Sequence, residues 1–340
     1  MFAPSDEPRL ICLTPMRNEA WVLDRFLRCA SLWADDIVIA DQMSDDGSRK
    51  IALRYPKVTL VDNKSTGYDE GERQRLVFER ARQIPAGKRI FLAIDADEVI
   101  SANWRESAEW QALRAAAPGT VIEFRWVNIL PGFKKCWIPS HPIAMGFVDD
   151  GKSGHSAGQF HVPRLPMPAG APRLVMNDVK VLHYQYTDWE RMKSKQRGYQ
   201  CSERVSNPAK RAIPLFRQYH VMDAFPPEQI HPMQDCWLED YEKRGIDMRG
   251  VSQERLYRWD REIIEKFLRH GTGTFRKLNV WDRDWESVAK QLDIPFMNGS
   301  LKDPRTAMEK RVHRWLASTQ PQCMKVKVRA VQQALRLMGW

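Results

Sequence analysis

The chain of 340 residues is 43% hydrophobic and 28% charged and contains 13 tryptophans, so it can bury a sizeable core and is not a mostly disordered chain. It has no uncharged apolar run of about 18 residues, and acids stand in its N-terminal MFAPSDEPRL where a signal peptide carries bases, which argues against a membrane span and against secretion. The net charge of +10 favours a polyanionic partner, but no helix-turn-helix or zinc-finger spacing appears and the bases are not interleaved with aromatics, so we expect no nucleic acid.

Short apolar runs alternate with helical patterns through the first part of the chain. The runs predict strands at residues 10–14, 37–40, 58–61 and 90–94, and helical patterns begin near Asn18 and cover residues 72–83. This alternation predicts a mostly parallel, Rossmann-like sheet flanked by helices, the α/β class. In such sheets ligands bind at the carboxyl ends of the strands.

The pattern changes after Pro118. Residues 121–127 and 179–184 predict further strands, and the Pro- and Gly-rich stretch 131–170 between them predicts excursion loops and short strands. From there to its end the chain is mostly helical in pattern. We therefore expect an α/β domain over residues 1–185 and a mainly helical region over residues 186–340.

Three carboxylates follow the fourth predicted strand directly, in the sequence Asp95-Ala96-Asp97-Glu98. Carboxylate oxygens are hard ligands suited to Mg²⁺ or Mn²⁺, and an ion held there can bridge the phosphates of a nucleotide diphosphate. Such an ion would offset the charge on a leaving group. The alternative explanation is that these acids cap a helix beginning near Ser101.

The segments LTPMRNE, IADQMSDDGS and FLAIDADE occur in this order at predicted strand ends. In these three segments the chain resembles the family 2 glycosyltransferases of GT-A fold, over roughly residues 10–185. The resemblance implies that the loop after the first strand lines a nucleotide pocket, that an acid after the second strand contacts base or ribose, and that a small-residue turn follows. The residues concerned are Thr14, Pro15, Arg17, Asn18 and Glu19 for the loop, Asp41 for the acid, and Ser44, Asp46 and Gly47 for the turn.

The same resemblance implies residues for the diphosphate and the metal. The motif GERQR offers Arg73 or Arg75 for the diphosphate, with Arg73 preferred. The resemblance also implies that Asp95 contacts both the nucleotide-sugar and the metal, and that Asp97 and His183 are further metal ligands. A histidine on an apolar strand is also explained as a hydrogen-bonded core residue.

Family 2 enzymes invert the anomeric carbon, so a carboxylate should take the proton from the acceptor hydroxyl. Asp149 and Asp150, in FVDDGKSGH, are the candidates for this base, because a polar, Gly-containing loop could lie over an acceptor. Acids of an ordinary surface loop are the alternative.

The sequence thus predicts an inverting, metal-assisted transferase that moves a sugar from a nucleotide-sugar to a glycan or glycolipid, for example in the synthesis of a bacterial cell-surface polysaccharide. A sugar nucleotidyltransferase would need a Gly-rich loop after the first strand, and LTPMRNE contains no glycine. A non-catalytic protein that binds nucleotide-sugars or acts as a scaffold remains the alternative from another class.

The cysteines and the C-terminal stretch indicate where the protein acts. The six cysteines lie far apart without a CxxC pair, as expected for reduced thiols in the cytoplasm. The stretch MKVKVRAVQQALRLMGW predicts a basic amphipathic helix that either contacts the inner face of a membrane peripherally or packs on its own domain. Its predicted apolar face comprises Met324, Val328, Val331, Leu335 and Met338, and its predicted lipid-contacting bases are Lys325, Lys327, Arg329 and Arg336.

Overall fold

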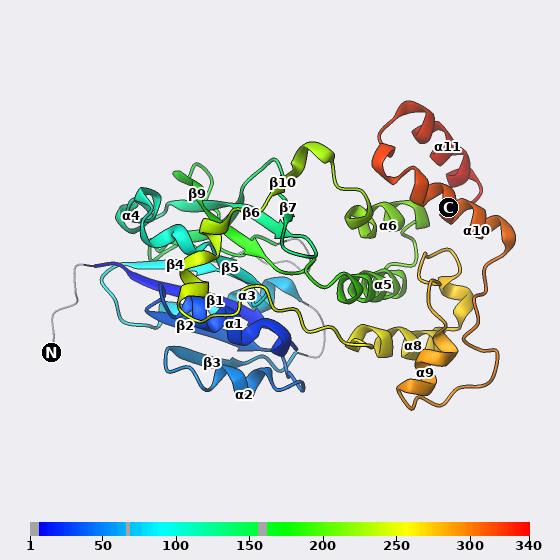
Figure 1. Ribbon diagram of the computed structural model, residues 1–340, viewed down its shortest axis with the longest axis horizontal. Coiled ribbons are helices and arrows are strands. Elements are labelled where there is room, and N and C mark those ends of the chain that lie inside the picture. Colours follow the sequence, from blue (N-terminus) through cyan, green and yellow to red (C-terminus); the bar gives the residue numbers. More distant parts are fainter. Residues whose placement is uncertain (1–6, 66–68, 156–161) are drawn as a thin grey trace. The chain divides into compact units, whose positions relative to one another are not determined.

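The structure is a computed structural model that describes residues 7–65, 69–155 and 162–340 (Figure 1). The chain divides into two compact units, which are described separately. Unit 1 comprises Met1–Thr187 and His231–Val251, and unit 2 comprises Asp188–Ile230 and Ser252–Trp340.

A parallel sheet forms the centre of unit 1. Strands β1 to β4 pair in parallel in the spatial order β4-β1-β2-β3, and the helices α1 to α3 connect or follow them, which confirms the predicted α/β class with flanking helices. The bounds are β1 Arg9–Met16, α1 Ala20–Ala30, β2 Asp36–Asp41, α2 Ser48–Ala52, β3 Val58–Asp62, α3 Glu70–Arg82 and β4 Arg89–Ala93.

Successive side chains of these strands point to opposite faces of the sheet, and both faces are covered. Leu10 and Cys12 of β1 belong to the same buried cluster as Phe26 of α1. Ile11 of β1 belongs instead to a cluster with Phe78 of α3. The near-continuous apolar strands seen in the sequence are therefore those of a sheet buried on both sides.

The sheet continues on the β4 side through antiparallel pairs. Strand β8 (Ile143–Val148) pairs antiparallel with both β4 and β6 (Val121–Ile129), inside the stretch predicted as loops and short strands; residues 156–161 of that stretch lie outside the described residues. The remaining elements are β5 Glu98–Ile100, η1 Ala102–Arg105, α4 Ala108–Ala115, β7 Lys135–Trp137 and β9 Arg173–His183.

Residues 231–251 belong to unit 1. The division expected near residue 185 assigned this segment to the C-terminal region. Apolar side chains of this segment are buried in the main cluster of unit 1, and Tyr241, on α7 (Glu239–Lys243), donates its hydroxyl to the Ile100 carbonyl at 2.9 Å. The Tyr184 hydroxyl reaches the Met248 carbonyl at 3.1 Å. The segment is short and has little periodicity, so the sequence did not show where it packs.

Unit 2 is helical, as predicted for the C-terminal region. Its buried clusters include Phe267, Trp281 and Trp285 in one and Phe216 and Trp340 in another. Its helices are α5 Trp189–Ser206, α6 Ala212–Tyr219, α8 Arg258–His270, α9 Trp285–Gln291, α10 Ala307–Ser318 and α11 Val326–Leu337, and short elements are η2 Val221–Asp223, η3 Pro227–Gln229, η5 Thr272–Phe275 and η6 Gln320–Gln322. Strand β10 (Ile230–Pro232) and η4 (Asp235–Trp237) lie between α6 and α7 in the chain. Among the described helices, none combines the length and the apolarity that a membrane crossing requires.

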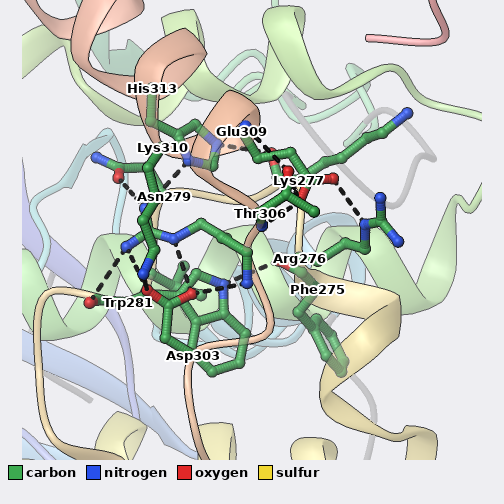
Figure 2. A network of polar contacts seen from close by, with 12 residues as sticks. Phe275, Arg276, Lys277, Asn279, Trp281, Asp303, Thr306, Glu309, Lys310 and His313 are labelled. Carbon is green, nitrogen blue, oxygen red and sulfur yellow. Dashed lines mark hydrogen bonds and ion pairs between the residues drawn. The ribbon is translucent and has the colours of Figure 1, made fainter.

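A polar network around the buried His313 joins several of these elements (Figure 2). His313 lies between the Arg305 guanidinium, 3.1 Å from its Nδ1, and the Lys277 carbonyl, 3.1 Å from its Nε2. Arg305 also pairs with Asp303 and donates to Asn279. Burial is the main cause that lowers the pKa of His313 to about 4. Both ring nitrogens of this histidine are thus satisfied within the protein, and its role is structural.

Helix α11 does not present the single apolar face expected from the sequence. Val328 and Leu335 are buried, whereas Met324, Val331 and Met338 are exposed. The correction follows from the helix geometry, because Val328, Gln332 and Leu335 stand at i, i+4 and i+7 and together form the buried stripe.

Candidate functional site

The loop after β1 and the turn after β2 lie at the same edge of the sheet and are bonded to each other. Asn18 donates its backbone N–H to the Ser44 hydroxyl at 2.9 Å, and Ala20 donates its own to Asp46 at 2.9 Å. Asp46 also accepts from the Ser48 backbone at 2.9 Å, and Gly47 has a φ of 96°, which favours glycine. The turn predicted from SDDGS therefore caps the start of α1, and Ser44 and Asp46 have a demonstrable structural role there.

Other predicted pocket residues of the first loop differ in how accessible they are. Thr14 is fully buried, and its hydroxyl donates to the Ile94 carbonyl at 2.8 Å, which ties β1 to the end of β4. Pro15 is buried as well. Glu19 accepts from the Trp21 indole at 2.6 Å. Of this loop, Arg17 forms no hydrogen bond or ion pair with a described residue, and its Nε is buried.

Asp41 ends β2 and is almost completely buried. Arg49 of α2 approaches it at 3.2 Å and approaches Asp62, at the end of β3, at 2.7 Å. The predicted contact of Asp41 with base or ribose would therefore compete with this arginine. Sequence analysis missed Asp62, although it stands at a strand end where polar residues were sought, and Arg49, which stands in α2 directly after the SDDGS turn.

The third acid of the motif after β4 is a buried anchor. Glu98 is fully buried and receives both guanidinium nitrogens of Arg164, at 2.5 and 2.9 Å, together with the Trp126 indole at 2.8 Å. It also accepts from the Asp95 backbone at 2.9 Å, which holds the motif in its turn. Although burial acts to raise it, the pKa of Glu98 is lowered by Arg164 and, to a smaller extent, by His183.

Asp95 faces the same arginine. One carboxylate oxygen lies 3.0 Å from Arg164, and the side chain is 37% exposed. Limited access of water to its inner side is the main cause that raises the pKa of Asp95 to about 6; Glu98 and Asp97 add to the rise, while Arg164 and Arg73 oppose it. Arg75, the other arginine considered for the diphosphate, is bonded to Glu72 and Glu79 of its own helix.

Asp97 and His183, predicted from positions far apart in the sequence, come together. The His183 Nε2 lies 3.4 Å from the Asp97 carboxylate, because β5 and β9 pair antiparallel at Glu98 and His183. The other ring nitrogen, Nδ1, lies 2.9 Å from the Asn128 side-chain oxygen, which also accepts from Gln185 at 3.1 Å. Nδ1 is therefore the donor, and in a neutral imidazole the lone pair of Nε2 faces the carboxylate.

This pair of acceptors fits a divalent cation. Adjacent ligands about 2.1 Å from an octahedral ion lie roughly 3 Å apart, close to the separation observed here. A histidine ligand that donates its second N–H to a side-chain oxygen is the usual arrangement at metal sites. No group of three or more His, Cys, Asp or Glu side chains is placed to hold a metal in the described part of the chain, and Asp95 is turned to Arg164 instead. Among the described residues, Asp97 and His183 are thus the two that would hold the ion.

The acids proposed as the catalytic base lie at the other end of β4. Asp149 follows β8 and donates its backbone N–H to the Arg89 carbonyl at the start of β4, at 3.0 Å. Its side chain is 2% exposed and lies between Arg82 at 2.7 Å and Arg89 at 3.0 Å. Against the effect of burial, hydrogen bonds from Ser153 and Lys152 lower the pKa of Asp150 to about 2.

This position is inconsistent with the prediction that Asp149 or Asp150 is the catalytic base. Strand β4 runs from Arg89 to Ala93, so its two ends lie roughly 15 Å apart at about 3.3 Å per residue. An acid at the amino end cannot deprotonate an acceptor held near Asp97, and a pKa of about 2 makes a weak base at neutral pH.

Four residues around Asp97 and His183 were also not predicted: Arg164, Trp126, Asn128 and Gln185. Trp126 stacks on the His183 ring with centroids 4.4 Å apart while its indole reaches Glu98, and Asn128 stands two positions further along the same face of β6. An amphipathic Trp and a polar Asn two positions apart in the strand-like run VIEFRWVNI were the only signal. Arg164 stands in a stretch without periodicity and gave none.

No protein-family model and no curated protein matches this sequence. Among solved structures, residues 1–349 of S. aureus TarS are similar over 84% of this chain and 78% of that chain, with 10% identity and a TM-score of 0.36. Glucosyl-3-phosphoglycerate synthase from Mycobacterium tuberculosis, in complex with Mg²⁺ and uridine diphosphate, is similar over 35% of this chain and 44% of that chain, with 14% identity and a TM-score of 0.27. The 4-diphosphocytidyl-2C-methyl-D-erythritol synthase from Anaerococcus prevotii covers 42% and 70%, with 14% identity and a TM-score of 0.29. At such scores these likenesses carry no weight for function, which rests on the site itself.

Proposed function

We propose that unit 1 is the catalytic domain of a metal-assisted glycosyltransferase that takes its sugar from a nucleotide-sugar and inverts the anomeric carbon. The observation that carries the proposal is the pair formed by Asp97 and His183, 3.4 Å apart at the carboxyl end of β4. Ligands of parallel α/β sheets bind at this end. The second ring nitrogen of His183 is fixed by Asn128, so in a neutral imidazole the lone pair of Nε2 would be directed at the carboxylate.

The residues around this pair fit a nucleoside diphosphate. Asp97 and His183 would hold Mg²⁺ or Mn²⁺, which when bound offsets negative charge on the leaving diphosphate. Arg17, at the end of β1, and Arg73, at the start of α3, are the cations that would contact phosphate oxygens. Arg164 holds Asp95 and Glu98 and thereby fixes the loop that carries Asp97.

The loop after β1 and the turn after β2, which the sequence predicts to line the nucleotide pocket, remain part of the proposal. The loop with Asn18 and Glu19 and the turn with Ser44 and Gly47 would shape the nucleoside side of the pocket. Backbone N–H groups of Asn18 and Glu19 donate to serine hydroxyls of the turn, which holds the two segments together. A glycan or glycolipid is the proposed acceptor. Asp149 and Asp150 take no part in the reaction.

The test is calorimetric titration of uridine and guanosine diphosphates and their sugar conjugates, with and without Mn²⁺, into the full chain. We expect one nucleotide to bind only with Mn²⁺, and Asp97→Asn to weaken this binding by about a hundredfold or more, since a ligand to the ion is lost. His183→Gln should act in the same direction.

Asp150→Asn is the matched control, because it makes the same carboxylate-to-amide change at the other end of β4 and should leave binding unchanged. If no nucleotide binds with any divalent ion, the donor site is refuted and the scaffold alternative gains. If nucleotide binds with Mn²⁺ but no conjugate is ever turned over with any acceptor, a non-catalytic binding protein is the better description.

A further inference from the structure

Helix α11, drawn in red near the C-terminus in Figure 1, has two apolar sides, one buried and one exposed among the described residues. Its inner stripe, Val328, Gln332 and Leu335, is buried, and Leu335 belongs to the cluster that α6 and α10 supply with Phe216 and Leu316. The outer face is a different one. Val326 and Leu337, at its two ends, are 82% and 84% exposed.

The outer face is continuous along the helix. Val326, Ala330, Ala334 and Leu337 recur at spacings of four, four and three residues, which places them on one side over roughly 16 Å. Met324 and Met338, which flank the two ends of the helix in the chain, are 77% and 57% exposed as well. Large apolar side chains gathered in this way on a surface mark an interaction site.

Positive charge surrounds this face. Residues 310–340 contain seven lysines and arginines and no acidic residue. Lys327 flanks the apolar stripe on one side and Arg329 and Arg336 flank it on the other, at the 100° spacing of an α-helix. In the described part of the chain, Lys325, Lys327, Arg329 and Arg336 form no ion pair, whereas Lys310 on α10 pairs with Asp303.

We infer that this outer face of α11 binds the surface of an anionic lipid bilayer, lying in the plane of the headgroups. An apolar stripe between two rows of bases is the arrangement of helices that bind in this plane, where the long basic side chains reach phosphate groups while the stripe enters the acyl boundary. A second copy of the chain fits less well, because a symmetric contact would bring two positive faces together without acids to pair them. The inference does not depend on the proposed transferase activity.

Sedimentation of the full chain with vesicles tests the inference, in the absence of nucleotide and divalent metal. We expect sedimentation with vesicles that contain phosphatidylglycerol and none with phosphatidylcholine alone, and we expect salt to release the protein. The triple variant Lys325→Gln, Lys327→Gln, Arg329→Gln should bind about a hundredfold more weakly, since each basic residue near the surface contributes about fivefold. The double variant Val326→Ser, Leu337→Ser should also lose binding.

Matched controls remove the same groups elsewhere in unit 2. Arg269→Gln, Lys290→Gln, Lys302→Gln takes away three exposed charges, and Leu268→Ser, Met297→Ser takes away two exposed apolar side chains. Both controls should bind as the unaltered chain does. Point changes are preferred to deletion of the helix because Leu335 and Trp340 are part of a buried cluster. Since the altered side chains are exposed, all variants should melt at the same temperature.

Three outcomes would overturn the inference. The first is that the unaltered chain does not sediment with anionic vesicles. The second is that the controls weaken binding as much as the variants on α11, which would reduce the effect to net charge. The third is a concentration-dependent dimer that Leu337→Ser dissociates, which would assign the face to a second copy. Nucleotide binding by the α11 variants, measured in parallel, separates this result from that of the proposed function.

Discussion

The two ends of strand β4 carry the same kinds of residue and use them differently. At the amino end, Arg82 and Arg89 enclose Asp149 from two sides, and the carboxylate has no capacity left for a ligand. At the carboxyl end, Arg164 pairs with Glu98 and Asp95, while Asp97 faces the Nε2 of His183. Acids close to arginines are therefore not by themselves a site. What marks a candidate site is the carboxylate that faces a second possible ligand.

The largest effect that would test this comparison is expected from Arg164→Met. The change leaves Glu98, which is fully buried, without its cation and next to two other carboxylates. Loss of one partner of a buried ion pair costs about 3–5 kcal/mol of the free energy of unfolding. Urea unfolding measures this loss for the whole protein, and amide hydrogen exchange of residues in β4 and β5 measures it locally.

A double-mutant cycle with Glu98→Gln provides the control for this prediction. The double variant should be destabilised by clearly less than the sum of the two single variants, since it no longer contains a buried charge without a partner. A cost below about 1 kcal/mol for Arg164→Met would mean that the carboxyl end is not held by this pair.

The next largest effect is expected at the amino end, from Asp149→Asn. Arg82 and Arg89 are each about a quarter exposed, so water partly solvates them when their partner is neutral, and we expect a loss of about 2 kcal/mol. Mn²⁺-dependent nucleotide binding should be unchanged in the folded variant. If binding or turnover disappeared while the fold remained intact, the two ends of β4 would not be functionally separate.

A third prediction concerns how His183 is held. Asn128→Leu removes the oxygen that accepts from Nδ1, so the ring is free to turn and to change its tautomer. We expect Mn²⁺-dependent nucleotide binding about tenfold weaker, as is typical when the partner of a metal-bound histidine is removed. Asn128→Asp keeps an acceptor and should lose less.

Pulsed electron paramagnetic resonance of bound Mn²⁺ distinguishes positioning from a merely structural role. The nitrogen coupling of a bound imidazole should be present in the unaltered chain and in Asn128→Asp, and be altered or weakened in Asn128→Leu. Identical spectra and affinities in all three proteins would show that Asn128 does not position His183.

The parts of the fold and site that could be predicted are those that depend on short, contiguous segments of the sequence. Strands β1 to β4 are short apolar runs, and their order alone places Asp41 and Asp97 at one edge. His183 was predicted only through the family resemblance, and its contact with Asp97 required the pairing of β5 with β9. Asp149 was misplaced because nothing in the sequence shows that β8 runs antiparallel to β4, which carries its end to the wrong edge. Arg164 acts from a stretch without periodicity, so only the folded chain brings it to Glu98.

The smallest expected effect concerns the amino end of β4 and is a change in the pH dependence of stability when Asp150 is replaced. The pKa of Asp150 is lowered to about 2, below the unfolded value of about 3.9, so the folded state holds the charged carboxylate more firmly than the unfolded state does. The stability that this contributes is complete above about pH 4 and is lost as the pH falls toward 2. The Asp150 side chain is 10% exposed, so water still screens part of this interaction, and about 1 kcal/mol of the contribution remains. Asp150→Asn should therefore be slightly less stable than the unaltered chain at neutral pH and should lose less stability between pH 4 and pH 2, measured by urea unfolding across that range. Parallel curves for the two proteins would show that Asp150 is not held in its charged form, and the amino end of β4 would then be less fully paired than its geometry indicates.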